Sequence, residues 1–222
     1  MSYKQEFIEF MVRSKVLMFG SFKTKSGRIA PYFVNSGNFT MGEQIAKLGN
    51  FYAQCLVENS PNDFNGIFGP AYKGIPLAVA TSISLYLNHG LNIPYCFNRK
   101  EQKDHGEGGN IIGYSPKTGD KIAVVDDVIT AGTSFRESFS FLKSVADVQI
   151  TSLTVSVDRM EKGTGNKTTL QELGDDFAVK VNAIVTIADI MEYLYNRKID
   201  GKVYLDDTVK RQIEDYLKVY GA

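Results

Sequence analysis

The sequence predicts an α/β protein whose mainly parallel sheet is flanked by helices. After Pro61, short apolar segments alternate with segments of helical periodicity. Strand and helix alternating at this spacing imply right-handed crossovers between parallel strands. Residues 122–125 are apolar at every position, as expected of a strand buried on both faces. The 222 residues, 43% of them hydrophobic, fit one compact domain of this class with a small appended lobe.

We expect the N-terminal segment, residues 1–60, to supply helices and most of a small hood lobe, and residues 61–222 to form the core. The expected N-terminal elements are a helix over 3–19 that Gly20 ends, a basic turn and aromatic strand within 22–37, and a helix over 41–58.

In the core, the expected strands are 65–69, 93–97, 121–125, 149–157 and 181–187, and the expected helices are 75–87, 135–145 and, as the last one, 187–196. Residues 99–113 and 161–174 lack periodicity. Ligands of such sheets bind at the carboxyl ends of the strands. The loops to inspect therefore follow Gly69, Phe97, Val125 and Val157.

Composition excludes several classes of protein. There are 25 basic and 25 acidic side chains, so no global charge attracts nucleic acid or membrane. The thiols of Cys55 and Cys96 form no CxxC motif and suit a reducing compartment. No signal-peptide core is present, and no run reaches the roughly 18 apolar residues of a membrane span. We expect a soluble, cytoplasmic protein with no nucleic-acid or membrane partner.

The most informative motif is the run IAVVDDVITAGTS at 122–134. Asp126 and Asp127 follow the buried strand, and small residues then lead into a helix. Ser134 and Glu137 have the spacing of a capping box. Backbone N–H groups and hydroxyls in such a turn can bind a phosphate. Alternatively, the Asp and Thr residues are only turn and cap residues.

This run resembles the phosphoribosyl pyrophosphate (PRPP) signature of type I phosphoribosyltransferases, which implies their fold and Mg²⁺-dependent chemistry. The resemblance implies that Asp126 and Asp127 lie at the ribose hydroxyls and are catalytic, because fixed carboxylates stabilise the cationic ribose of the transition state. It gives the rest of PRPP binding here to Val128, Ile129, Thr130, Ala131, Gly132, Thr133 and Ser134. No direct metal ligand is assigned, because Mg²⁺ is expected mainly through PRPP and pyrophosphate.

Two further loops supply cations. The run RKEQKDHGEGG at 99–109 taken alone reads as a solvated charged loop. It resembles the catalytic loop of orotate phosphoribosyltransferases, which reaches into the partner's site in a homodimer. The resemblance assigns PRPP binding to Arg99, Lys100, Lys103 and His105, with Lys103 also catalytic. Residues 68–74 resemble the family's pyrophosphate loop, which assigns Tyr72 and Lys73 to PRPP.

The flanking motifs indicate the base. KSGR at 25–28 and PYF at 31–33 resemble the N-terminal segment of orotate phosphoribosyltransferases. The resemblance assigns Lys25 to PRPP and orotate, and Phe33, Val34 and Thr130 to orotate. Val34 replaces the family's second Phe. Arg159 suits a carboxylate-bearing base, since Arg grips carboxylates with two hydrogen bonds. Alternatively, it only pairs with Asp158 or Glu161.

We therefore expect a monofunctional orotate phosphoribosyltransferase. This pentosyltransferase would convert PRPP and orotate to orotidine 5′-phosphate and pyrophosphate in de novo pyrimidine (UMP) synthesis. One alternative is a phosphoribosyltransferase for another base, such as a purine, which Lys25, Phe33 and Arg159 disfavour. A second is a regulator that binds PRPP without turnover. The zero net charge, the acid pair and the basic loop disfavour it.

Overall fold

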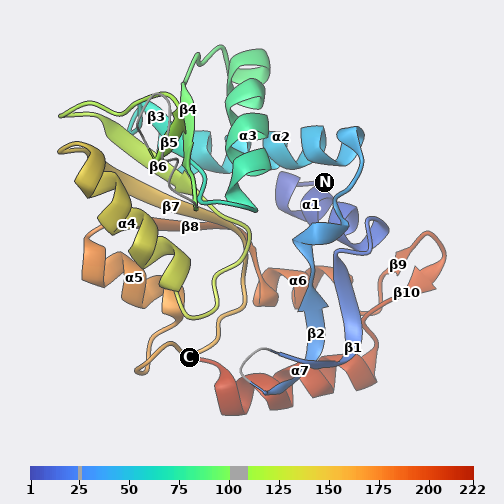
Figure 1. Ribbon diagram of the computed structural model, residues 1–222. Coiled ribbons are helices and arrows are strands. Elements are labelled where there is room, and N and C mark those ends of the chain that lie inside the picture. The colour runs from blue at the N-terminus through green and yellow to red at the C-terminus, as the bar shows by residue number, and fades with distance from the viewer. Residues whose placement is uncertain (25–26, 101–109) are drawn as a thin grey trace.

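The structure, a computed structural model, describes residues 1–24, 27–100 and 110–222. Its centre is a six-stranded sheet in the order β5-β4-β3-β6-β7-β8 (Figure 1). Neighbouring strands are parallel except for the edge strand β5, which is antiparallel to β4. The mainly parallel sheet is therefore confirmed. The strands are β3 (Gly66–Phe68), β4 (Tyr95–Asn98), β5 (Ile111–Gly113), β6 (Lys121–Val125), β7 (Gln149–Asp158) and β8 (Lys180–Thr186).

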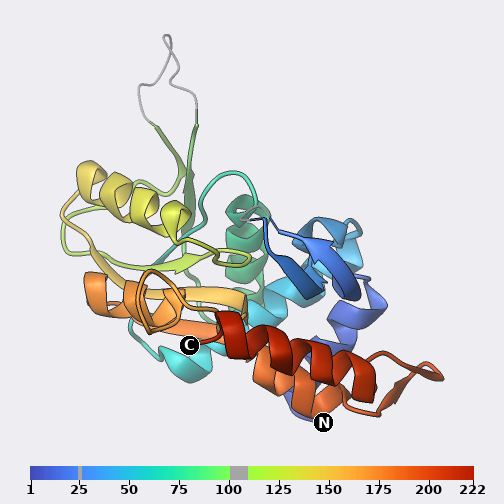
Figure 2. The same ribbon diagram turned by 90° about the horizontal axis from the view of Figure 1, so that it is seen from below.

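Helices cover both faces of the sheet (Figures 1 and 2). Strand β6 shows why, since its apolar residues alternate between two cores. Ala123 and Val125 join the core that contains α2 (Gly42–Asn59) and α3 (Gly74–His89). Ile122 and Val124 join the core with α4 (Thr133–Val145) and α5 (Thr169–Phe177). A strand apolar at every position is thus buried on both sides, as predicted.

The N-terminal helix is shorter than expected. Helix α1 spans Tyr3–Arg13, and the chain then turns through Lys15, whose φ is 55°. The following residues form β1 (Leu17–Lys23), which pairs antiparallel with β2 (Ile29–Val34). The prediction of a helix over 3–19 was wrong at its C-terminal end, and Gly20 lies inside a strand. Pairing with β2 stabilises residues 17–23 as a strand more than their apolar spacing stabilises a helix.

The C-terminal part contains elements that the sequence analysis missed. Helix α5 begins within the stretch expected to lack periodicity, at a capping box of Thr168 and Gln171. Helix α6 (Ile187–Leu194) is followed by the hairpin of β9 (Lys198–Ile199) and β10 (Lys202–Val203), and by α7 (Asp207–Tyr220). Helix α6 is therefore not the last. Helix α7 packs under the β1–β2 hairpin, so both ends of the chain build this lobe (Figure 1).

The remaining predicted strands and helices are confirmed, with ends that differ by at most two residues. No helix among the residues that the structure describes is long and apolar enough to cross a membrane. A boundary at residue 60 between hood segment and core stays a prediction.

Helices α2 and α3 approach closely at Gly49. A Cβ atom there would lie 2.5 Å from both the carbonyl carbon and oxygen of Ala80. We expect Gly49→Ala to lower the free energy of unfolding by about 1–3 kcal/mol, as overpacked helix contacts do. Urea denaturation measures it. The control is Gly42→Ala in the first turn of α2, where a Cβ would meet no atom within 4 Å. Equal stability of the two variants would contradict this account.

Candidate active site

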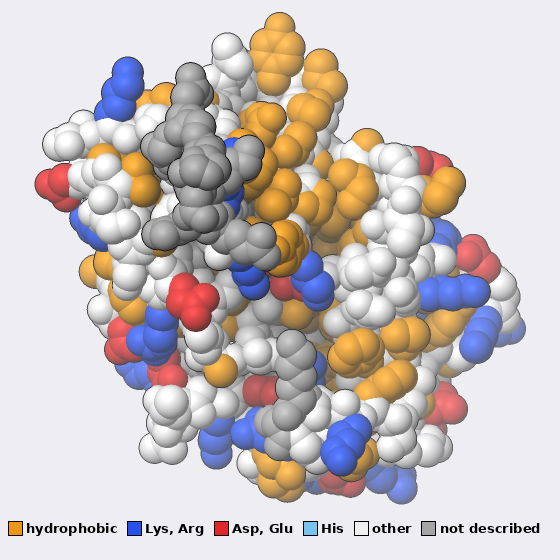
Figure 3. All heavy atoms as spheres, in the orientation of Figure 1, with side chains coloured by type: hydrophobic (Ala, Val, Ile, Leu, Met, Phe, Trp, Pro, Cys, Tyr) orange, Lys and Arg blue, Asp and Glu red, His pale blue; other side chains and the backbone are white. Residues whose placement is uncertain are grey.

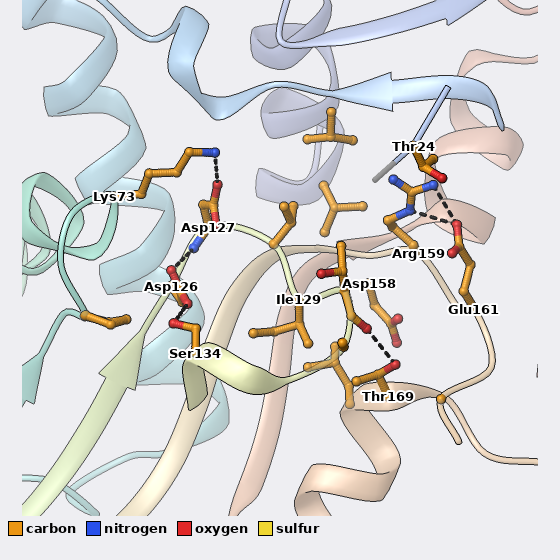
Figure 4. A pocket seen from close by; sticks show the side chains of 18 of the residues that line it. Thr24, Lys73, Asp126, Asp127, Ile129, Ser134, Asp158, Arg159, Glu161 and Thr169 are labelled. Atoms are coloured by element: carbon orange, nitrogen blue, oxygen red, sulfur yellow. Dashed lines mark hydrogen bonds and ion pairs between the residues drawn. The ribbon is translucent and has the colours of Figure 1, made fainter. Parts of the chain in front are cut away.

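A cavity of about 1070 Å³ lies at the carboxyl ends of β3, β6 and β7, where the sheet topology predicted a ligand site. Loops after these three strands form one side, and the β1–β2 hairpin contributes to the other. Figure 4 shows the side chains from these segments converging on the same space. The loop after β4 contributes Lys100 among the described residues.

Asp126 is buried at the end of β6, and polar groups surround it. Its Oδ1 accepts a hydrogen bond from the backbone N–H of Asp127 at 2.9 Å, and its Oδ2 accepts one from the Ser134 hydroxyl at 3.0 Å. The Tyr52 hydroxyl donates to its backbone carbonyl at 2.7 Å. Burial, and then the charge of Asp127, raise the pKa of the Asp126 carboxyl to about 6.

Asp127 is equally enclosed but has a cationic partner. Its Oδ2 lies 2.7 Å from Lys73 Nζ and accepts a hydrogen bond of 2.7 Å from the Ser36 hydroxyl. The Ser156 hydroxyl donates to its backbone carbonyl at 2.6 Å. Lys73 comes from the loop after β3, and its side chain extends towards Asp127 (Figure 4). The ion pair therefore joins two of the loops predicted to bind PRPP.

The turn from β6 into α4 differs from the predicted capping box. Helix α4 begins at Thr133 and has Gly132 as its N-cap, with φ 75° and no side-chain cap. The Ser134 hydroxyl donates to the buried Asp126 instead, because an unpaired buried carboxylate costs more than an open helix end. A Cβ at Gly132 would crowd Leu173 at 3.1 Å. Without a side-chain cap, the first backbone N–H groups of α4 stay available at the turn. Such free N–H groups at the start of a helix favour the binding of an anion.

The predicted phosphate residues divide into two sets. The cavity is lined by Val128, Ile129, Thr130, Ala131 and Ser134. Gly132 and Thr133 do not line it. The hydroxyl of Thr169 donates to the Thr130 carbonyl at 2.9 Å and fixes the turn from α5.

Arg159 follows β7 and lines the cavity. Its Nε donates to Glu161 Oε1 at 2.8 Å, and its guanidinium carbon lies 5.0 Å from the centroid of the Tyr32 ring. Asp158 accepts instead from the Met160 N–H at 2.8 Å. Of the two predicted partners, Glu161 is the one that pairs with Arg159. This arginine is thus both ion-paired and directed towards a ligand space.

The hairpin brings aromatic and apolar groups to the cavity. Phe33 lines it and stacks on Phe22, with ring centroids 5.5 Å apart. Val34 also lines it but is only 6% exposed, so its side chain packs mainly into the core. Phe22 was not singled out from the sequence. A single ring with an apolar neighbour therefore faces this end of the cavity.

The loop after β3 carries Tyr72, which is 65% exposed. Lys100 Nζ lies 5.2 Å from the centroid of its ring, and the Ala71 N–H donates to Asn98 Oδ1 at 2.9 Å. The ends of β3 and β4 are therefore tied together. Arg99 does not line the cavity, and its backbone N–H donates to the Asn110 carbonyl. Lys25, Lys103 and His105 lie outside the described residues.

Several residues at the site had no predicted role. Ser36 and Asp127 are 91 positions apart in the chain, so no local pattern could reveal their contact. Thr169 lies in the polar stretch that was not predicted as a helix. Arg28 lines the cavity and belongs to the KSGR motif, which could have indicated it.

Known proteins share this architecture. Residues 35–183 match the phosphoribosyl transferase domain family. Orotate phosphoribosyltransferase from Clostridium beijerinckii is 51% identical, with 100% of this chain and 99% of the relative covered. The enzyme from Colwellia psychrerythraea is 49% identical over 90% of this chain and 89% of its own. The crystal structure of orotate phosphoribosyltransferase from Francisella tularensis has TM-score 0.84 at 38% identity, covering 98% of this chain and 100% of that one.

The family match, together with the fold and the buried acid pair beside the turn into α4, thus defines a phosphoribosyltransferase. Within that class, the chain belongs to the orotate phosphoribosyltransferase family. It transfers the phosphoribosyl group of PRPP to orotate, giving orotidine 5′-phosphate and pyrophosphate in pyrimidine biosynthesis. The predicted function and enzyme class are confirmed. The alternatives of a purine-specific enzyme and a PRPP sensor are set aside.

The raised pKa of Asp126 predicts a stability effect with a definite sign. The folded protein binds this proton more tightly than the unfolded chain, so the stabilisation is full below about pH 4 and is lost as the pH rises through about 6. Asn cannot ionise; its Oδ1 can accept from the Asp127 N–H, and its Nδ2 can donate to the Ser134 hydroxyl oxygen in place of the bond that Ser134 donates to Asp126. We expect Asp126→Asn to raise the free energy of unfolding at pH 8, by at most about 3 kcal/mol, and to change it little at pH 4.

Denaturation at both pH values tests this expectation. The control is Asp120→Asn, because hydrogen bonds from the Lys117 N–H and the Tyr114 hydroxyl lower the pKa of the partly exposed Asp120 carboxyl. Its stabilisation is present above the unfolded pKa, so Asp120→Asn is expected to destabilise at pH 8. Destabilisation by both substitutions at pH 8 would contradict the assigned cost of burying Asp126.

Proposed function

We propose that the enzyme catalyses transfer through the Asp126–Asp127 pair, which binds the ribose hydroxyls of PRPP and stabilises positive charge at C1. The observation that carries this proposal is the burial of both carboxylates, 6% and 7% exposed, at the cavity end of β6. Carboxylates in a dry, preorganised site interact more strongly with a developing cation than carboxylates in water. Asp126 must be ionised for this role. Because its pKa is raised to about 6, we expect activity to be lost as the pH falls through about 6.

We assign the 5-phosphate to the turn of residues 128–134 and the start of α4. Hydroxyls of Thr130, Thr133 and Ser134 would supplement the backbone N–H groups there. Thr133 would have to turn towards the cavity, and the Ser134 hydroxyl would have to redirect the hydrogen bond that it donates to Asp126. Tyr72, Lys73, Arg99 and Lys100 would bind the pyrophosphate portion. Lys73 is the best placed, since its amine already reaches Asp127 across the cavity. Arg99 would have to turn towards the cavity to take part.

Mg²⁺ fits this site as part of the substrate complex. Among the described residues, no cluster of three His, Cys, Asp or Glu side chains could hold a metal ion. Mg²⁺ prefers oxygen ligands, and PRPP would supply most of them, so no residue is assigned as a direct ligand. Held in this way, Mg²⁺ would supply positive charge against the pyrophosphate group.

Orotate would lie between the hairpin and the loop after β7. Arg159 would bind its carboxylate, Phe33 would stack on the ring, and Val34 and Thr130 would complete the pocket. Lys25 is assigned to both substrates. With a base that loses its proton readily, the chemistry depends on leaving-group stabilisation. We assign that role to Lys103, with His105 as a further ligand of PRPP.

A test of the pyrophosphate assignment is Lys73→Ala. Because a hydrogen bond to a charged group contributes about 1.5–3 kcal/mol, we expect KM for PRPP to rise on the order of 10- to 100-fold. KM for orotate is expected to change less. Lys121→Ala is the matched control. Its amine pairs with Asp63 at 3.3 Å at the start of β6, away from the cavity. Equal KM values for the two variants would remove Lys73 from the site.

We further propose a homodimer, in which residues 99–109 serve the partner's site, in the cytoplasm and without a nucleic-acid partner. An exposed apolar face of α3 supports it. Ile83, Tyr86 and Leu87 are 52%, 59% and 70% exposed and share one side of the helix. Figure 3 shows a continuous band of hydrophobic side chains over this part of the molecule. A second copy of the chain would bury it.

The dimer proposal is tested with Leu87→Asp. A charge within the apolar face is expected to give a monomer in analytical ultracentrifugation and to reduce activity, since each site then lacks the partner's loop. Met41→Asp is the control, because Met41 is 64% exposed at the start of α2 and outside this face. A Leu87→Asp variant that stays dimeric would exclude α3 as the interface.

A further inference from the structure

Glu161 lies at the centre of a small charged cluster beside the cavity. It contacts two arginines that line the same cavity, Arg159 and Arg28. The cluster therefore has two positive charges against one negative charge. A carboxylate-bearing base would supply the second negative charge. The inference below rests on the proposed role of Arg159 in binding that carboxylate.

Glu161 occupies one edge of the Arg159 guanidinium. Its Oε1 lies 2.8 Å from Nε and 2.6 Å from Nη2 (Figure 4). Nη2 is buried and has no hydrogen bond of good geometry among the described residues. A guanidinium is a planar fork with five donors. Occupation of the Nε–Nη2 edge leaves the adjacent edge, formed by Nη1 and the second proton of Nη2, for another carboxylate.

Glu161 is itself held by the C-terminal helix. The Tyr216 hydroxyl donates to Oε1 at 2.9 Å, and Arg28 NH1 lies 3.5 Å from Oε2. The guanidinium carbon of Arg28 lies 4.6 Å from the centroid of the Tyr220 ring. Both tyrosines belong to α7, so this helix contacts the cluster at two points.

Backbone hydrogen bonds join the same two segments. The Lys162 N–H donates to the Tyr220 carbonyl at 2.8 Å, and the Ala222 N–H donates to the Met160 carbonyl at 3.1 Å. The end of the chain is thus bonded to the residues directly after Arg159. These contacts fix where the Glu161 carboxylate can lie.

We propose that Glu161 is a positioning residue that, held by Tyr216, orients Arg159 towards the carboxylate of the base. The Glu161 carboxylate does not compete with the base, because it binds the other edge of the guanidinium. It restricts a flexible side chain to the conformation that binding requires, so orotate binds without the cost of ordering Arg159. Tyr216 acts only through Glu161.

Steady-state kinetics of Glu161→Gln and Tyr216→Phe test the proposal. We expect KM for orotate to rise about tenfold in Glu161→Gln and about threefold in Tyr216→Phe, as expected when preorganisation is lost. KM for PRPP and kcat are expected to change less than twofold. In the double variant, Tyr216→Phe should add nothing to Glu161→Gln, since it acts through that side chain.

Tyr195→Phe is the matched control. The Tyr195 hydroxyl also donates to a carboxylate on α7, that of Asp207 at 2.6 Å, but it lies outside the cavity lining. We expect unchanged KM values. Inhibition by uracil, which lacks the carboxylate, should change less than twofold in Glu161→Gln.

Three outcomes would overturn the proposal. A lower KM for orotate in Glu161→Gln would mean that Glu161 competes with the base. Equal changes in both KM values and kcat, or additive effects in the double variant, would indicate a general structural role. Arg159→Ala separates this inference from the assignment it rests on. If that variant leaves KM for orotate unchanged, the assignment of Arg159 fails. If only Glu161→Gln and Tyr216→Phe leave it unchanged, the positioning role alone fails.

Discussion

Two adjacent carboxylates buried at the end of β6 are the constraint on which the site depends. Such a pair is costly, since each charge is desolvated and repels the other. Side chains from five separate parts of the chain donate hydrogen bonds to these two residues. Ser36 after the hairpin, Lys73 after β3 and Ser134 on α4 donate to the carboxylates. Tyr52 on α2 and Ser156 on β7 donate to the backbone carbonyls. Satisfying the two acids therefore also fixes how the hairpin, the helices and the loops meet.

The two carboxylates differ in how their charges are stabilised, and this difference bears on the chemistry of the site. Asp127 has the Lys73 amine at 2.7 Å, whereas Asp126 has only neutral donors and a pKa raised to about 6. A carboxylate held near the top of its range is ready to gain from any positive charge that develops beside it. In the role proposed for Asp126, a cationic ribose would offset the cost of ionising this carboxyl. Stability and catalysis would then oppose each other at this residue.

The sequence predicted those features that lie close together in the chain. The strand, both acids and the phosphate turn occupy 122–134, so one run of residues carried the central site. The prediction that Ser134 caps α4 was wrong because its hydroxyl donates to the buried Asp126, a contact that local spacing cannot reveal. The same reason hid Ser36 and Tyr216, whose partners are 91 and 55 positions away. The predicted C-terminal end of the first helix was wrong because Leu17–Lys23 pair with β2 as a strand.

One fold can serve many ligands, so selection of the base must come from the segments added to the parallel sheet. Here both additions come from the ends of the chain. The N-terminal hairpin brings Phe33, and the C-terminal helix brings Tyr216 to the acid that contacts Arg159. The two ends also touch, through the edge-to-face contact of Tyr32 and Tyr216 at 6.3 Å. A change of base can therefore evolve in this lobe without disturbing the buried pair of Asp126 and Asp127.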